Sequence, residues 1–479
     1  MSGTTWIETF GSPLYVYELA RVREAHEALR RALPEPSVVY YSLKANPHEA
    51  LVQTLVGLGC HAEVSSTGEL RAALDSGCLP QHVLYTGPGK TTAEIAFALR
   101  QGVIQFSVDS RHDMDKVLEE ASRQRRQVRL VLRINPDEPV PDLPLTMTGV
   151  PSQFGFDASL LLEEGGAAQL DPGPWGAIVG FHIYMGTNLT TPESLLRMYA
   201  KTIELAHRLA AALRIELELL DLGGGFGHPF IKEGAPYDFS AIRGPLEANL
   251  EAYFPQWRQG RPAVAFESGR YLVGAAGTLY STVQDVKMSK GQQFVILDAG
   301  IHHLGGMSGL GRLTRISAGL VKVSGDRTGA ETATAVAGAT GWTGPGGAAR
   351  LPRPAPGTAQ PSASEAMPKR QQLAAAGSPA LHAEPPQESA AEVAGMLAHV
   401  VGPLCTPLDY LARNERVPLL EPGDIVAVPN AGAYGLTASL IGFLSRETPC
   451  ELVVDEKGEL SCSQLTLRRV KEEVRSYAR

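Results

Sequence analysis

The stretch SVVYYSLKAN, residues 37–46, decides the fold. It is a short apolar run, rich in β-branched and aromatic side chains, that ends at Lys44 and leads into a segment with helical periodicity at 48–58. A strand followed at once by a helix is the repeating unit of α/β proteins. We therefore expect Lys44 to lie at the carboxyl end of a strand in an α/β fold.

Seven further runs repeat this pattern. With the first, the expected strands span 37–43, 60–64, 82–86, 103–108, 128–134, 177–183, 216–221 and 263–267. Helical periodicity fills the segments between them, such as 48–58, 67–77, 91–101, 191–213 and 243–254. Eight repeats predict a (β/α)8 TIM barrel over residues 26–272, although a doubly wound open sheet gives a similar alternation.

The positions of the chemically capable side chains favour the barrel, because barrel enzymes build their sites at the carboxyl ends of the strands. The following residues occupy or directly follow such ends: Lys44, Glu63, Arg133, His182, Gly223, Gly224, Gly225 and Glu267.

A second, β-rich domain is expected after residue 272. Strand-like pieces follow one another there with little helix between them, as in TLYSTVQDVKM (278–288) and DIVAVPN (424–430). The opening segment PLYVYEL (13–19) is a further strand candidate, so we assign 1–25 and 273–479 to this domain. Residues 325–391 hold too few large apolar side chains to form a core, and we expect a disordered insertion there.

Bulk composition excludes several classes of protein. A net charge of −8 over 479 residues argues against a nucleic-acid surface. No targeting segment or membrane-length apolar run is evident, which predicts a cytoplasmic protein without a membrane partner. The five cysteines show neither CxxC pairs nor metal-ligand spacing, so we expect free thiols and no metal site.

Several motifs suit the binding of a phosphorylated aldehyde. A partly desolvated lysine such as Lys44 loses its proton more readily and forms Schiff bases with aldehydes. The triple glycine of LDLGGGFG (220–227) can close backbone N–H groups around a phosphate, and Arg270 in FESGR (266–270) offers further donors. Glu267 can face a pyridine nitrogen. Each motif alone is also compatible with a plainer interpretation, as a surface charge, a tight turn or a structural ion pair.

Three more side chains are candidates by type and position. His182, at the end of a strand, can lie against a ring face. Cys405, in the loop GPLCTPLD (402–409), can deliver a proton, and Tyr434, in GAYGLTAS (432–439), can reach a phosphate or substrate. Taken singly, a satisfied histidine, an inert thiol and a packing tyrosine are the plainer interpretations.

In order along the chain, YYSLKAN, VSSTGEL, FHIYMGTN, LDLGGGFG, FESGRY, GPLCTPLD and GAYGLTAS resemble the fold-type III pyridoxal-phosphate decarboxylases. This resemblance implies an alanine-racemase-like barrel with a C-terminal β-domain, and a homodimer whose sites lie at the interface. It also implies that Lys44 holds the pyridoxal 5'-phosphate aldehyde, that His182 stacks on the ring and that Glu267 faces the pyridine nitrogen.

The resemblance assigns further roles at the cofactor. Phosphate binding maps onto Gly223, Gly224, Gly225, Gly269, Arg270 and Tyr434, with Thr187 at the place where many relatives have serine; Arg133 is a further cofactor candidate. Cys405 would serve the partner subunit and return a proton to the substrate carbon.

The substrate is where the chain departs from diaminopimelate and ornithine decarboxylases, which carry an acidic residue directly after the catalytic cysteine. Thr406 stands there, and a buried distal ammonium left without a carboxylate costs several kcal/mol, unless Asp409 or glutamate residues elsewhere compensate. Four motifs are similar to those of a subgroup that acts on a glutamyl group tethered to an acyl carrier protein: TGVPSQFGFD (148–157), FESGRYL (266–272), DAGIHHL (298–304) and GPLCTPLD (402–409). Arg312 and Arg315 are candidates for contacts with such a substrate.

The leading hypothesis is therefore α-decarboxylation of a modified or carrier-tethered, glutamyl-like amino acid in specialised metabolism. Diaminopimelate decarboxylation is the alternative within this family. A racemase of the same barrel fold and a non-catalytic, decarboxylase-like regulator are further interpretations. Cys405 argues against the first, and retention of Lys44, Glu267 and Cys405 argues against the second.

Overall fold

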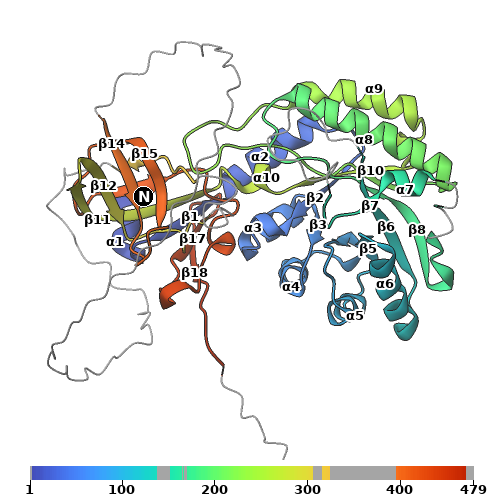
Figure 1. The fold of residues 1–479 in the computed structure, drawn as a ribbon, viewed down its shortest axis with the longest axis horizontal. Helices are drawn as coiled ribbons and strands as arrows, with labels where there is room; N and C mark the ends of the chain where they lie inside the picture. The colour runs from blue at the N-terminus through green and yellow to red at the C-terminus, as the bar shows by residue number, and fades with distance from the viewer. Residues whose placement is uncertain are drawn as a thin grey trace, which may run out of the picture. The chain divides into compact units, whose positions relative to one another are not determined.

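The computed structural model describes residues 3–137, 151–163, 166, 170–305, 316–323 and 395–470. They contain a parallel barrel and a mixed β-sheet (Figure 1). The expected insertion at 325–391 and the candidates Arg312 and Arg315 lie outside the described residues.

The barrel contains all eight predicted strands. Their bounds are β2 (Val38–Ser42), β3 (His61–Val64), β4 (Val83–Tyr85), β5 (Gln105–Val108), β6 (Val128–Asn135), β8 (Gly176–His182), β9 (Leu219–Asp221) and β10 (Ala263–Ser268). Every neighbouring pair is parallel, and the pairs β5–β6 and β10–β2 close the sheet on itself. The barrel is confirmed and the open sheet is wrong. A short strand, β7 (Phe156–Asp157), extends the edge of β6.

Helices follow the barrel strands and lie along their outer side, as α3 to α6 show in Figure 1. The five predicted segments form α3 (Glu49–Gly57), α4 (Thr67–Asp75), α5 (Thr92–Arg100), α8 (Pro192–Leu213) and α9 (Arg243–Tyr253). Helix α6 (Arg111–Gln124) also lies between two predicted strands, as the alternation requires. Further helices are α1 (Gly3–Phe10), α2 (Leu19–Ala32), α7 (Ala158–Leu162) and α10 (Arg270–Val273). Helix α2 runs through the expected domain boundary at residue 26.

Local signals explain where the helices start. The side chain of Thr91 accepts the backbone N–H of Glu94, and the Glu94 carboxylate accepts the backbone N–H of Thr91. These two bonds form a capping box at the start of α5. The hydroxyls of Ser66 and Ser110 cap α4 and α6 by accepting a backbone N–H. Within the described ranges, no helix combines the length and apolarity that crossing a membrane requires.

The second sheet is built from both ends of the chain. Its strands are β1 (Leu14–Glu18), β11 (Gly277–Ser289), β12 (Gln292–Leu297), β13 (Val321–Lys322), β14 (Gly395–Val401), β15 (Tyr410–Pro418), β16 (Ile425–Val428), β17 (Cys450–Val454) and β18 (Leu460–Gln464). Strand β1 pairs antiparallel with β11 and parallel with β17. The expectation that PLYVYEL adds a strand to the β-rich part is confirmed.

Two hydrogen bonds join the loop after β2 to a loop of the sheet. The backbone N–H of Tyr434 donates to the carbonyl of Ala45 at 2.7 Å, and the Asn46 side chain donates to the carbonyl of Gly432 at 2.9 Å. A third bond steadies the barrel side of this contact, because the hydroxyl of Tyr41 donates to the carbonyl of Asn46 at 2.6 Å. Together they fix Tyr434 beside the loop that carries Lys44.

The sheet also buries a carboxyl group. Glu451 lies on β17, and the hydroxyl of Tyr17 donates to its Oε1 at 3.0 Å. Burial raises the pKa of Glu451 to about 7, and the bond from Tyr17 opposes that rise only in part. The folded protein therefore favours the neutral acid more strongly than the unfolded chain does.

This preference makes stability depend on pH. Between an ordinary pKa of 4.5 and about 7, the unfolded chain loses the Glu451 proton while the folded chain keeps it, so the free energy of unfolding falls as pH rises. We predict that Glu451→Gln raises the free energy of unfolding by on the order of 2 kcal/mol at pH 8 and changes it little at pH 4. Urea denaturation at both pH values measures this. Exposed Glu459→Gln is the control; an equal gain from Glu451→Gln at both pH values would contradict the assignment.

Candidate active site

A pocket lies at the carboxyl ends of the barrel strands. Its walls come from the ends of β2 and β10, the loops after β8 and β9, and one tyrosine of the sheet: Ser42, Lys44, Tyr184, Thr187, Gly224, Gly225, Phe226, Glu267, Ser268, Gly269, Arg270 and Tyr434. Seven of the predicted cofactor residues are thus brought together with Lys44 in one place.

Lys44 reaches the pocket with its amine held by an ion pair. Its Nζ lies 3.0 and 3.1 Å from the two carboxylate oxygens of Glu63, and Thr86 donates to Glu63 Oε1 at 2.7 Å. Burial lowers the pKa of Lys44, but Glu63 and then Glu267 outweigh this effect and raise it above the ordinary lysine value. The expectation that desolvation lets Lys44 lose its proton more readily is therefore wrong in this structure, because the carboxylates hold the amine as an oriented ammonium. That ammonium must lose a proton before it can attack an aldehyde.

Three further ionisable groups cluster inside the barrel. Ligand atoms of His182, Asp221 and Glu267 lie within 4.8 Å of one another, with His182 Nε2 at 3.3 Å from Glu267 Oε1. Burial lowers the pKa of His182, but Glu267 outweighs it and raises it. Burial and then Glu267 raise the pKa of Asp221 to about 7. Of these three residues, only Glu267 lines the pocket. Its carboxylate faces the pocket, and the buried imidazole of His182 lies behind it.

His182 lies behind the pocket wall. Its ring is buried, and its Nδ1 lies 2.9 Å from the hydroxyl of Ser107. Two residues further on, Tyr184 lines the pocket, and burial raises the pKa of its hydroxyl to about 12. A Cβ on Gly223 would lie 2.8 Å from the Tyr184 ring, so the glycine turn and this ring are in close contact. The stacking of His182 on a cofactor ring stays a prediction.

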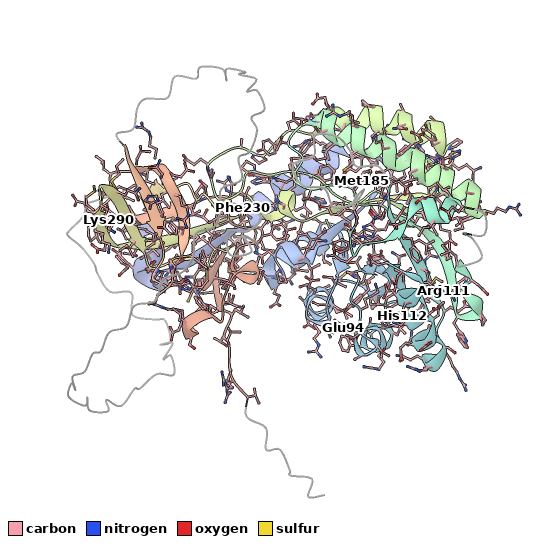
Figure 2. All side chains as sticks on the ribbon, viewed as in Figure 1. Glu94, Arg111, His112, Met185, Phe230 and Lys290 are labelled. Carbon is pink, nitrogen blue, oxygen red and sulfur yellow. The ribbon has the colours of Figure 1, made fainter. Side chains whose placement is uncertain are left out.

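The glycine turn and Arg270 suit an anion. Gly223 and Gly225 have φ values of +68° and +114°, which favour glycine, and a Cβ on Gly224 would lie 2.6 Å from the carbonyl of Glu267. The guanidinium of Arg270 lies 4.7 Å from the Tyr434 ring centroid and 5.3 Å from that of Phe230, which is labelled in Figure 2. Its Nε is buried without a hydrogen-bond partner among the residues described. A phosphate would satisfy it.

Pyridoxal phosphate fits these residues. The glycines leave the backbone of the turn without side chains, the buried Nε of Arg270 lacks a hydrogen-bond partner among the described residues, and the carboxylate of Glu267 lines the pocket. The amine of Lys44, the anion site at Arg270 and the glycine turn, and the pocket-facing carboxylate of Glu267 are the three contacts that an aldehyde, a phosphate and a ring nitrogen require.

Other predicted residues lie elsewhere. Arg133 lies 3.8 Å from Asp109 and stacks on Phe154 at 4.4 Å, and it does not line the pocket. Cys405 is exposed and is also absent from the lining. Thr406 and Asp409 line a second cavity in the sheet.

The loop that carries Cys405 is fixed by Asp409. One carboxylate oxygen of Asp409 accepts the backbone N–H of Ile301 and the other accepts that of Leu404, each at 2.8 Å. The hydroxyl of Thr406 accepts the backbone N–H of Leu408 at 3.3 Å. Asp409 is therefore engaged in holding its own loop.

Sequence reasoning does not find several contributors to the site. Ser42, Tyr184, Phe226 and Ser268 line the pocket, and Asp221 accepts the backbone N–H of Gly223 at 2.9 Å. Glu63 is predicted at a strand end but without a role, and it pairs with Lys44. Side-chain alternation is the signal that could have found Tyr184. It lies two residues from His182 in FHIYMGTN, so continued alternation points both to the same side.

Comparison with known proteins also indicates a pyridoxal-binding barrel followed by a sheet domain. Residues 19–274 match the pyridoxal binding domain of pyridoxal-dependent decarboxylases, and residues 365–432 match their C-terminal sheet domain. The chain is 29% identical to the L-glutamyl-[BtrI acyl-carrier protein] decarboxylase of Niallia circulans, over 94% of this chain and 90% of the relative. It is 28% identical to the diaminopimelate decarboxylase of Aquifex aeolicus, over 90% and 84%.

Among solved structures, the fold is similar to that of Helicobacter pylori diaminopimelate decarboxylase complexed with L-lysine. The TM-score is 0.71 at 22% identity, over 96% of this chain and 95% of that one. Because the matched pyridoxal binding domain covers more than half of the chain and coincides with the barrel that holds Lys44, the protein belongs to the pyridoxal-dependent decarboxylase family.

Proposed function

We propose that this pyridoxal-phosphate-dependent amino-acid decarboxylase acts on a glutamyl-like group tethered to a carrier protein. The observation that carries the proposal is Thr406, a neutral residue directly after Cys405. The carboxylate nearest in that loop, Asp409, is buried and already accepts two backbone N–H groups. A distal ammonium would find no free carboxylate in this loop, whereas a tethered acyl group needs none. The relative from Niallia circulans supports the same substrate class.

The pocket residues divide the binding of the cofactor between them. When bound, pyridoxal phosphate supplies the electron sink that lets the bond between Cα and the carboxylate break. Lys44 would hold the aldehyde carbon. Glu267 would face the ring nitrogen, with His182 3.3 Å from its carboxylate to hold it in place, and Tyr184 lines the same pocket. The phosphate would be held by Thr187, Gly223, Gly224, Gly225, Gly269, Arg270 and Tyr434.

A proton donor for Cα is the remaining requirement. Cys405 is an exposed thiol on the sheet, and it reaches the pocket of a second copy of the chain in this proposal. Exposed apolar side chains nearby support such a contact: Leu408, Leu440, Phe443 and Leu444. Arg446 connects the two loops that carry them by donating to the carbonyl of Pro403 at 3.2 Å.

The reaction also limits how the substrate is attached. The α-carboxylate must be free, because it leaves as CO₂, and the α-amine must be free to bond the cofactor aldehyde. A glutamyl group can therefore be tethered only through its side-chain carbonyl, and this removes the charge at the distal end of the substrate. The neutral Thr406 suits that end.

The substrate proposal is tested by measuring CO₂ release from two compounds. We expect turnover of a γ-glutamyl pantetheine thioester, and turnover of meso-diaminopimelate at least about 100-fold lower in kcat/KM, because an unpaired ammonium costs about 3 kcal/mol or more. Lys44→Ala should abolish turnover of both and prevent covalent retention of the cofactor. Robust turnover of diaminopimelate with none of the thioester would instead establish the alternative function.

The shared site is tested by mixing two inactive variants. Lys44→Ala and Cys405→Ala should each lose nearly all activity as purified proteins. If Cys405 serves the partner, mixed dimers contain one intact site, and an equal mixture should recover about a quarter of the wild-type rate. Each variant alone at the same total concentration is the control. No recovery, despite exchange of subunits shown by tagged chains, would place Cys405 and Lys44 in the same chain's site.

A further inference from the structure

A second cavity of about 310 Å³ lies on the sheet beside the Cys405 loop. Its floor is apolar and half-buried, and its edges carry hydroxyls and one exposed ammonium, while the carboxylate of Asp409 in its lining is buried and accepts two backbone N–H groups. The lining residues are Lys287, Ser289, Phe294, Ile296, Val401, Gly402, Leu404, Thr406, Pro407, Asp409 and Tyr410. We call this cavity the sheet groove. A volume of this size suits a small ligand or the arm of a larger one.

Strand register gives the sheet groove a direction. Lys287 on β11 pairs with Phe294 on β12, and Ile296 on β12 pairs with Val401 on β14. Phe294 and Ile296 are two residues apart, or about 7 Å along the strand, and they share a face. The chain leaves β14 after Val401 and reaches Cys405 within a few residues. The ammonium therefore lies at one end of the groove and the thiol loop lies at the other.

We propose that the sheet groove binds the phosphopantetheine arm of the carrier protein, with Lys287 on the phosphate and the thioester end directed toward Cys405. This inference rests on the proposed function and adds to it the place where the tether is recognised. Lys287 offers a testable contact within the described residues, which Arg312 and Arg315 do not.

The chemistry of the groove matches that of the arm. Phe294, Ile296 and Val401 offer an apolar floor for the dimethyl-substituted carbon, and hydroxyls at the edge can bond the two amides. Lys287 is exposed and has no ion pair within the described part of the chain, so its charge is available to a phosphate. Asp285 lies on the same strand but does not line the groove.

Reversing one charge tests the proposal. Decarboxylation is followed with the γ-glutamyl thioester of pantetheine and with the same thioester of 4'-phosphopantetheine. In the wild-type enzyme the phosphate should lower KM about tenfold, and Lys287→Glu should remove that advantage while leaving kcat and the KM for the unphosphorylated thioester unchanged. Lys290→Glu is the matched control, since Lys290 is an exposed lysine at the turn after β11 that does not line the groove (Figure 2).

Binding gives a second readout. Free 4'-phosphopantetheine should inhibit the wild-type enzyme competitively, and Lys287→Glu should weaken that inhibition about tenfold while Lys290→Glu should not. Equal effects of the two lysine variants, or no effect of the phosphate on KM, would overturn the proposal even if both thioesters are decarboxylated. Failure of both thioesters as substrates, with diaminopimelate turned over, would overturn the proposed function and the inference with it.

Discussion

The parallel pairing of β2 with β10 closes the barrel, and the cofactor site depends on it. The register sets Glu267 beside Tyr40 and Ser268 beside Tyr41, so the first and last barrel strands end together. Their following loops then meet so closely that a Cβ on Gly269 would lie 2.7 Å from that of Ala45. Lys44 and Arg270, far apart in the sequence, thus line one pocket. A one-residue slip would turn these side chains to the other face.

The charged residues of the pocket are arranged so that each end of the pocket can bind a different chemical group. Glu63 compensates Lys44, and His182 compensates Glu267, but Arg270 has no carboxylate partner among the residues described. A guanidinium with a buried, unpaired nitrogen is costly, and it is tolerated where a ligand anion will pair with it. The same reasoning explains why the site suits a phosphorylated cofactor.

Much of this could be predicted from the sequence, because each barrel strand is a short apolar run with polar residues at its end. Strand β15 is harder to predict, since charged residues such as Arg413 and Arg416 interrupt its apolar pattern. Pattern alone also does not separate His182 from Tyr184; packing against Ser107 and against the glycine turn gives them different places. Contacts between distant loops, such as that of Asp409 with Ile301, leave no local signal.

The division of the chain into barrel and sheet also separates two kinds of requirement. The barrel must hold one cofactor, so its lysine, glycines and carboxylate are constrained by that molecule. The loop that carries Cys405 is constrained differently, because Asp409 fixes its backbone through the N–H groups of Leu404 and Ile301. The side chain of Thr406 accepts one local bond, from the N–H of Leu408, which a carboxylate could accept equally well. An exchange of residue at Thr406 can therefore alter the charge presented to the substrate without disturbing the loop or the cofactor. Under the proposed function, the choice of substrate therefore depends on the sheet rather than on the barrel.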